Sequence, residues 1–290
     1  MEISKDFSLL MVNKPKGITS TEVLNKIKEK FNLKKVGHTG TLDPFAEGLL
    51  ILLLGRATRL AEYYQKLPKT YIATGLLGIT TDTYDITGKV LKRVEGKYPS
   101  KDTLEEVLKT FVGEIDQQPP PFSAKKIRGK RAYNLARKGL KVELEPVKVK
   151  IYSLRLLDYK PPRFTIQTTV SGGTYIRSLI KDIGDKLSLG ATTQELLRTA
   201  VGGLSIEKAY KLDVILNSEH VEDFLLPPWI GLPYPTIEVD RQRAFKLKNG
   251  QFIEIDTSQN EERFLIFSEG EFVGIARTFK GKLKPERIFL

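Results

Sequence analysis

Apolar residues recur at helical spacing near the start of the chain. In the stretch TSTEVLNKIKEKF, Val23, Ile27 and Phe31 lie four positions apart, which places them on one face of a helix. Thr19 precedes this face and Glu22 follows three residues later, and such a pair forms a capping box at a helix start. The pattern therefore predicts an amphipathic helix that begins just after residue 19.

Two further stretches show the same periodicity. Asp102 and Glu105 repeat the capping signature before LEEVLKTFVG, and Gly113 is the expected stop of that helix. In SGGTYIRSLIKDIGDKL, two glycines at 172–173 precede the third predicted helix. Its apolar stripe consists of Ile176, Leu179, Ile180, Ile183 and Leu187.

Runs of apolar and β-branched residues predict strands between these helices. The runs are LLILLLG at 49–55, YIATGLLG at 71–78, VKVKIYSLRLLDY at 147–159 and RFTIQTTV at 163–170. They do not alternate regularly with the helices, and this irregular order disfavours a doubly wound parallel fold. We therefore expect an α+β fold with a mixed, mainly antiparallel sheet flanked by helices.

Prolines interrupt the chain before its last segment. LLPPWIGLPYP, at 225–235, holds four prolines and one glycine and is typical of a stiff linker. Beyond it, the short alternating segments FIEID, RFLIF, FVGIA and RIFL are separated by turn dipeptides that end in glycine. That spacing predicts a small β-barrel. The expected division is a domain at 1–232 and a second at 233–290.

Composition and charge narrow the function. The 290 residues carry a net charge of +12 at a pI near 9.5, which favours a polyanionic partner such as nucleic acid, although a cationic surface can also serve solubility. The chain has no cysteine, and its two histidines, His38 and His220, are far apart, so neither a thiol nucleophile nor a metal site is expected. The N-terminus lacks the pattern of a secretory signal and no apolar run could span a bilayer, so we expect a cytoplasmic protein.

The positive charge is concentrated in one segment. KKIRGKRAYNLARKGLK, at 125–141, has eight lysines and arginines and no acidic residue, and three prolines at 119–121 precede it. Mutually repelling cations favour an arm that leaves the core and binds nucleic acid, against the alternative of a solvated loop. The candidate RNA-binding residues are Lys125, Lys126, Arg128, Lys130 and Arg131, within an insertion at about 119–145.

A polar segment just before the run of leucines is a candidate for chemistry. GHTGTLDP, at 37–44, holds a histidine and an aspartate between two glycines and a proline. The residue before a proline is restricted to extended conformations, so Pro44 helps to fix Asp43 at the edge of a buried strand. The local sequence also fits an ordinary Asp-Pro turn, and it does not decide between the two.

Three other places are ambiguous when taken alone. Tyr71 begins a strand and could be an ordinary cross-strand aromatic residue. Asp82 and Asp85 could be metal ligands, but a segment rich in threonine, aspartate and glycine more often forms a turn. Arg177 lies near a helix start, where the helix dipole disfavours a cation; it either pairs with a buried carboxylate or lies in solvent.

Together these stretches resemble the TruB-type tRNA pseudouridine synthases. The resemblance covers the whole catalytic part, and its most specific motifs are HTGTLDP and GTYIRS. The matching segments are GHTGTLDPFAEGLL, KTYIATGLLGITTDTYDITG, QQPPPFSAKKIRGKRAYNLARKG, SGGTYIRSLIKDIG and LLRTAVG. The C-terminal segment resembles, more weakly, a PUA domain, a small RNA-binding β-barrel.

The resemblance implies roles for individual residues. Asp43 matches the essential catalytic aspartate, and Arg177 the arginine that pairs with it. Tyr71 matches the aromatic residue that stacks on the flipped base, and Leu196 an apolar residue beside the pocket. His38 matches a histidine that contacts RNA and assists base flipping. The basic insertion corresponds to a segment that grips the tRNA.

The resemblance also implies an activity. The expected reaction converts the uridine at position 55, in the T-loop of tRNA, to pseudouridine, without a cofactor, by a monomer whose partner is tRNA. The C-terminal domain could contact the acceptor stem. Because the chain lacks the extensions of the dyskerin-type enzymes, we expect a stand-alone enzyme. The alternatives are a pseudouridine synthase that acts on another RNA, and an RNA chaperone that refolds tRNA.

Overall fold

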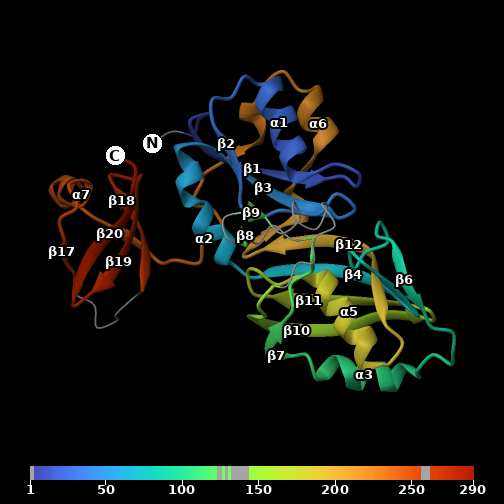
Figure 1. Cartoon of the computed structure of the whole chain (residues 1–290). Helices are drawn as coiled ribbons and strands as arrows, with labels where there is room; N and C mark the ends of the chain where they lie inside the picture. The colour runs from blue at the N-terminus through green and yellow to red at the C-terminus, as the bar shows by residue number, and fades with distance from the viewer. Residues whose placement is uncertain (1–2, 123–125, 128–129, 132–143, 256–261) are drawn as a thin grey trace.

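The computed structural model describes residues 3–122, 126–127, 130–131, 144–255 and 262–290. Within these residues, eleven strands form one large sheet, whose central path is β14-β1-β3-β12-β4-β11-β10-β7 (Figure 1). The strands are β1 (Phe7–Lys14), β2 (Val36–His38), β3 (Glu47–Gly55), β4 (Lys69–Leu77), β7 (Gly113–Gln117), β10 (Val147–Lys160), β11 (Arg163–Val170), β12 (Ala191–Val201), β13 (Leu204–Ser205), β14 (Tyr210–Lys211) and β15 (Leu225–Leu226). The described pairings are antiparallel except for β1–β14 and β3–β12. The predicted α+β fold with a mixed, mainly antiparallel sheet is therefore confirmed.

The helices of the large sheet are α1 (Ser20–Lys30), α2 (Ala61–Lys66), α3 (Lys101–Lys109), α5 (Ile176–Lys186) and α6 (Leu212–Asn217), and η1 (Arg56–Leu60) leads into α2. The capping box predicted for α1 is present. The predicted start of α3 is wrong: Ser100 is its N-cap, and the Ser100 hydroxyl accepts from the Thr103 amide at 3.1 Å. Gly113 does not end this helix but begins β7, in a left-handed conformation that glycine adopts freely.

Helices cover each half of the large sheet. α1 and α6 pack on the end formed by β1 and β3, whereas α3 and α5 pack where β4, β11 and β10 run side by side (Figure 1). Every residue of the predicted strand at 49–54 is fully buried, because alternate side chains of β3 enter different hydrophobic clusters. This burial on both faces explains why the run is continuously apolar.

The C-terminal part forms a separate sheet. In the residues described there, its strands follow the order β16-β18-β19-β20-β17 and α7 (Arg241–Lys248) packs against them. The strands are β16 (Thr236–Glu238), β17 (Ile253–Glu254), β18 (Arg263–Ser268), β19 (Glu271–Phe279) and β20 (Lys282–Ile288). Two predicted turns, at 269–270 and 280–281, have positive φ at both residues, as type I′ hairpins require. The sequence pattern did not predict β16 and α7, and the boundary expected near residue 233 stays a prediction.

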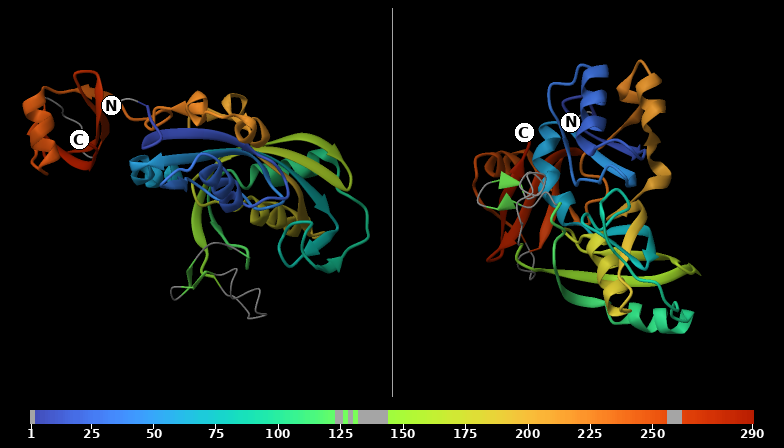
Figure 2. Two further views of the ribbon diagram at one scale, coloured as in Figure 1. Left: turned by 90° about the horizontal axis from the view of Figure 1, so that it is seen from above. Right: turned by 45° about the vertical axis from the view of Figure 1, so that its right-hand side comes forward.

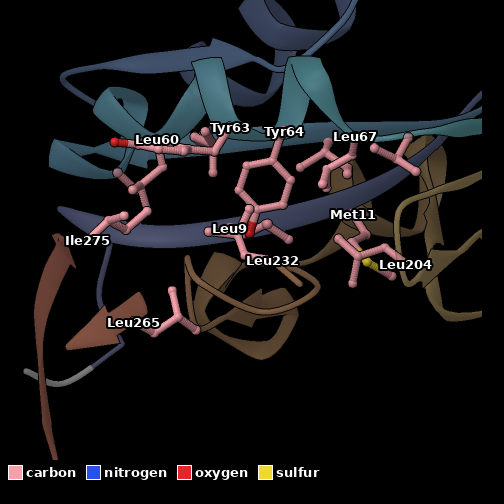
Figure 3. Packing of buried hydrophobic residues seen from close by; sticks show 14 of the residues in the cluster. Leu9, Met11, Leu60, Tyr63, Tyr64, Leu67, Leu204, Leu232, Leu265 and Ile275 are labelled. Atoms are coloured by element: carbon pink, nitrogen blue, oxygen red, sulfur yellow. The ribbon is translucent and has the colours of Figure 1, made fainter. Parts of the chain in front are cut away.

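The C-terminal sheet packs against α2 and β1 at one end of the molecule (Figure 2). In Figure 3, Leu265 and Ile275 lie near Leu60, Tyr63 and Leu9 within this apolar contact. In the described part of the chain, no helix combines the length and the apolar character that crossing a bilayer requires.

The two halves of the large sheet meet at a narrow junction. β3 and β12 pair in parallel at only two positions, where Leu197 lies opposite Glu47 and Arg198 opposite Gly48. Gly48 has a φ of 110°, and a Cβ atom there would lie 2.4 Å from the Arg198 carbonyl oxygen. Glycine is therefore required for the strands to approach each other. The loop that carries Asp43 leads directly into this junction.

Candidate active site

The loop between β2 and β3 is held by hydrogen bonds along its length. The Ser20 hydroxyl accepts from the Leu42 amide at 2.8 Å and donates to the Leu42 carbonyl at 3.0 Å. The Gly17 amide donates to the Pro44 carbonyl at 2.8 Å, and Arg198 Nη2 donates to the Gly40 carbonyl at 3.2 Å. Asp43 therefore lies in a loop that α1, β12 and the segment after β1 fix in place.

Arg177, the second residue of α5, holds Asp43 from one side. Its Nε lies 2.8 Å from Asp43 Oδ2 and its Nη2 donates to Asp43 Oδ1 at 3.1 Å. Nη1 donates to Asp85 Oδ2 at 3.3 Å and to the Thr83 carbonyl at 2.6 Å, and Nη2 also donates to the Phe122 carbonyl at 3.1 Å. All five N–H groups of the guanidinium are thus engaged. Of the two alternatives for Arg177, pairing with a buried carboxylate is the correct one, because Asp85 is buried.

The segment after β5 (Ile79–Thr81) supplies the second carboxylate. Asp85 Oδ1 accepts from the amide and the hydroxyl of Thr87, at 2.9 and 2.5 Å, while its Oδ2 faces Arg177. Asp82 Oδ1 accepts from the Lys89 amide at 2.7 Å, as a turn aspartate does. Within the described residues, no group of three or more histidine, cysteine, aspartate or glutamate side chains could hold a metal ion. From the sequence, Asp85 was expected to be a turn residue or a metal ligand, and its ion pair with Arg177 was not predicted.

Burial and the neighbouring cations shift the pKa of Asp43 in opposite directions. Burial raises the pKa of its carboxyl group, and the charge of Asp85 raises it further. The guanidinium of Arg177 and the ammonium of Lys14 oppose that rise in pKa. One-third of the Asp43 side chain is exposed, whereas only 6% of the Arg177 side chain is. The carboxylate is therefore held on its inner side and open on its outer side.

An apolar cluster includes residues of the loop that carries Asp43. Tyr71 on β4 and Leu196 on β12 are buried in the cluster that also contains Leu42 and Ala46 of the Asp43 loop. The register of β4 and β12 brings Leu196 opposite Ala73, two residues from Tyr71. His38 is the last residue of β2, half-buried, at the start of the same loop. The structure thus pairs Asp43 with Arg177 and places Tyr71 and Leu196 in the apolar cluster that includes Leu42 of the Asp43 loop, with His38 at the start of that loop.

The predicted RNA-binding residues are only partly described. Lys126 belongs to β8 (Lys126–Ile127), and Lys130 and Arg131 form β9 (Lys130–Arg131), which pairs with β8. These strands lie to one side of the large sheet (Figure 2). Lys125 and Arg128 lie outside the described residues.

Sequence reasoning missed several buried polar residues around the site. Lys14 is fully buried and donates to the carbonyls of Pro15 and Ile18, at 2.9 and 2.7 Å, and burial lowers its pKa to about 8. Ser20 hydrogen-bonds to the backbone of Leu42, one position before Asp43, and Gln117 to that of Tyr175, two positions before Arg177. Their positions in the sequence carry no distinguishing signal, because a serine in the first turn of a helix and a glutamine at a strand end are common.

The fold is the pseudouridine synthase fold. The chain is 26% identical to a chain in the crystal structure of a Cbf5-Nop10-Gar1 complex, with a TM-score of 0.77 over 99% of this chain and 86% of that one. A chain in an H/ACA RNP bound to a substrate RNA containing 2′-deoxyuridine is 24% identical and has a TM-score of 0.75, over 98% and 86% of the two chains; it shares the fold.

The family follows from the sequence comparisons. The pattern of the TruB family pseudouridylate synthase N-terminal domain matches residues 28–176, and that of the pseudouridine synthase II TruB C-terminal domain matches residues 235–289. The tRNA pseudouridine synthase B of Aquifex aeolicus (strain VF5) is 45% identical over 284 residues, covering 97% of this chain and 99% of that one. The enzyme of the same name from Clostridium tetani (strain Massachusetts / E88) is 41% identical over 287 residues, again covering 97% and 99%. The chain belongs to the TruB family of pseudouridine synthases, and it is an isomerase.

Proposed function

We propose that this enzyme converts the uridine at position 55, in the T-loop of tRNA, to pseudouridine. The observation that carries the proposal is the Asp43 carboxylate, which Arg177 grips with two nitrogens while a third of the aspartate side chain stays exposed. The names of the relatives support tRNA as the substrate class. The T-loop position is supported by the HTGTLDP and GTYIRS motifs.

The chemistry fits an ionised carboxylate without an oxidant or a group donor. The N1–C1′ bond breaks, the uracil rotates, and C5 bonds to C1′; C5 then loses its proton and N1 gains one. Asp43 acts on the reacting nucleotide, and Arg177 keeps it ionised in a partly buried site. The target base leaves its stack to reach Asp43, and stacking on Tyr71 recovers about 1–3 kcal/mol of that cost. Leu196 lines the same pocket, and His38 contacts the RNA beside it.

Substrate binding extends beyond this pocket. We propose that the cations Lys125, Lys126, Arg128, Lys130 and Arg131 bind the phosphates of the T-stem-loop. We also propose that the chain divides near residue 233 and that the C-terminal domain contacts the acceptor stem. The family match at residues 235–289 supports that division. The enzyme is proposed to act as a cytoplasmic monomer without a metal ion.

The test is release of tritium from 5-tritiated uridine, because C5 loses its hydrogen only when the new bond forms. The wild-type enzyme should release tritium from a T-stem-loop transcript, and an Asp43→Asn variant should bind the transcript without releasing it. If Asp43→Asn kept the wild-type rate, the assigned role of Asp43 would be wrong. If the wild type bound the RNA but released nothing, an RNA chaperone would account for the binding.

A further inference from the structure

Two buried side chains clamp the backbone beside the ion pair in the same way. Each donates one hydrogen bond to the carbonyl and accepts one from the amide of a single residue. One clamped residue immediately precedes Asp43, and the other precedes Arg177 by two positions. Each functional side chain therefore has its own polar support, contributed by a different part of the fold.

The clamp on the aspartate side is Ser20. It lies in the first turn of α1, is 1% exposed, and makes both of its hydrogen bonds to Leu42, 22 positions along the chain. Because Leu42 and Asp43 share a peptide plane, fixing the backbone of Leu42 also fixes where the Asp43 side chain leaves the loop.

The clamp on the arginine side is Gln117. This last residue of β7 is 0% exposed; its Oε1 accepts from the Tyr175 amide at 2.8 Å and its Nε2 donates to the Tyr175 carbonyl at 3.0 Å. Tyr175 is the N-cap of α5, and its own side chain makes no capping hydrogen bond. Gln117 thus joins the start of α5, and with it Arg177, to the edge strand of the sheet.

We propose that Ser20 and Gln117 are positioning residues that set the geometry of the Asp43–Arg177 pair. This inference rests on the proposed function, in which the carboxylate of Asp43 acts on the nucleotide. Reacting groups must be held to within about 0.5 Å, and a displacement of about 1 Å can reduce the rate by about 100-fold. Both side chains are buried and hydrogen-bond to backbone groups, so each affects the reaction through the backbone that it clamps.

The clamps also affect when Asp43 ionises. The charged groups that face Asp43 are Arg177 from α5, Asp85 from the segment after β5, and Lys14 from the end of β1. Loosening the pair weakens the opposition of Arg177 to the effect of burial, so the pKa of Asp43 rises further. The acid limb of the rate profile then moves to higher pH. A variant that only destabilises the fold would leave this limb in place.

The experiment uses the full-length enzyme with Ser20→Ala and Gln117→Met, singly and together. Thr278→Val is the matched control, because the Thr278 hydroxyl, 0% exposed in the C-terminal sheet, makes the same kind of clamp on Glu262. Tritium release is measured with enzyme in excess over the T-stem-loop RNA, from pH 5 to pH 8. The dissociation constant and the melting temperature are measured in parallel.

We expect each clamp variant to slow release by about 10- to 100-fold with a dissociation constant within about twofold of the wild type. The acid limb should move to higher pH, and the double variant should lose less than the product of the two single losses, because both clamps act on one ion pair. Thr278→Val should lower the melting temperature but leave the release rate and the acid limb unchanged. If Gln117→Met does not fold, Gln117→Asn, one methylene shorter, replaces it with the same expectation.

Wild-type rates and an unmoved acid limb in the clamp variants would overturn the inference, and so would an equal slowing in Thr278→Val. The wild type and Asp43→Asn are assayed beside them. The proposed function fails only if the wild type releases no tritium or Asp43→Asn releases it at the wild-type rate. Its failure is therefore distinct from failure of the inference about the clamps.

Discussion

Two helices, α5 on the large sheet and α7 on the C-terminal sheet, each have an arginine in the first turn, which is electrostatically unfavourable. Arg177 is the second residue of α5 and Arg241 the first of α7, and a cation in the first turn opposes the helix dipole. The side chain of Arg177 is 6% exposed, and that of Arg241 is 82% exposed. The first makes five hydrogen bonds or ion contacts within the site, whereas the second pairs with Glu269 at the surface.

The difference follows from what the two helices bury. α5 packs an apolar stripe against the sheet, which takes its first turn out of water, whereas α7 buries only Ala244 and Leu247 among the residues of that helix and leaves Phe245 64% exposed. A buried guanidinium requires a partner for every N–H group, whereas an exposed one is hydrated and needs none. An arginine at a helix start is thus a functional signal only where the helix is buried.

The largest expected effect is the loss of activity and stability on replacing Arg177, which we compare with the replacement of Arg241. Arg177→Met should reduce tritium release by at least about 1000-fold and destabilise the fold by about 3–5 kcal/mol, because it leaves the buried carboxylate of Asp85 and the partly buried one of Asp43 without their cation. Arg241→Met should change neither the rate nor the urea midpoint, because its ion pair lies in water. Urea denaturation and the tritium assay measure both. Similar losses in the two variants would remove the distinction between the helices.

Two glycines of positive φ extend the comparison to the backbone. Gly48→Ala should destabilise the fold by about 2–4 kcal/mol, because the new methyl group collides with the backbone of β12. Gly250, which follows α7 with a φ of 77°, has open space around it, so Gly250→Ala should cost only about 1 kcal/mol for the left-handed conformation. Urea midpoints of the two variants test the difference. An equal cost would show that the contact with β12 contributes nothing.

Salt dependence distinguishes the cation of the ion pair from cations that bind phosphate. The slope of the logarithm of the RNA-binding constant against the logarithm of the salt concentration is negative. Replacing Lys125, Lys126, Arg128 and Lys130 with glutamine should make it less steep by about 3, since each phosphate contact contributes about 0.7–0.9. The Arg177→Met variant should keep the wild-type slope. Filter binding of the T-stem-loop at several salt concentrations measures both. An unchanged slope in the fourfold variant would place the phosphate contacts elsewhere.

The smallest expected effect is the position of the acid limb in the wild-type enzyme. Burial raises the pKa of Asp43 above its usual range near 3.9, and the role proposed for Asp43 requires the ionised form. Tritium release should therefore fall tenfold per unit as the pH drops through that raised pKa, and level off above it. A limb at or below the usual range would mean that the pairing with Arg177 outweighs burial.

The sequence alone predicted the class of the fold and part of its elements, but not β1, β12, α2 or α6. The helix after Thr19, the strand at 49–54 and the hairpins of the C-terminal sheet follow from local patterns, because periodicity, capping and turn chemistry act between neighbouring residues. The predicted start of α3 was two residues too late, because the N-cap is Ser100 and not Asp102. β16 and α7 were missed because their patterns are short.

Only the tertiary structure decided which candidate residues meet. Asp43 and Arg177 are 134 positions apart, and the order of β3, β12 and β4 in the sheet brings the Asp43 loop and the start of α5 together. Asp85, Ser20 and Gln117 acquire their contacts only in that arrangement, because a hydrogen bond between distant segments leaves no periodic trace in either of them. The sequence determined that an aspartate stands in a constrained loop, and the fold determined which charges surround it.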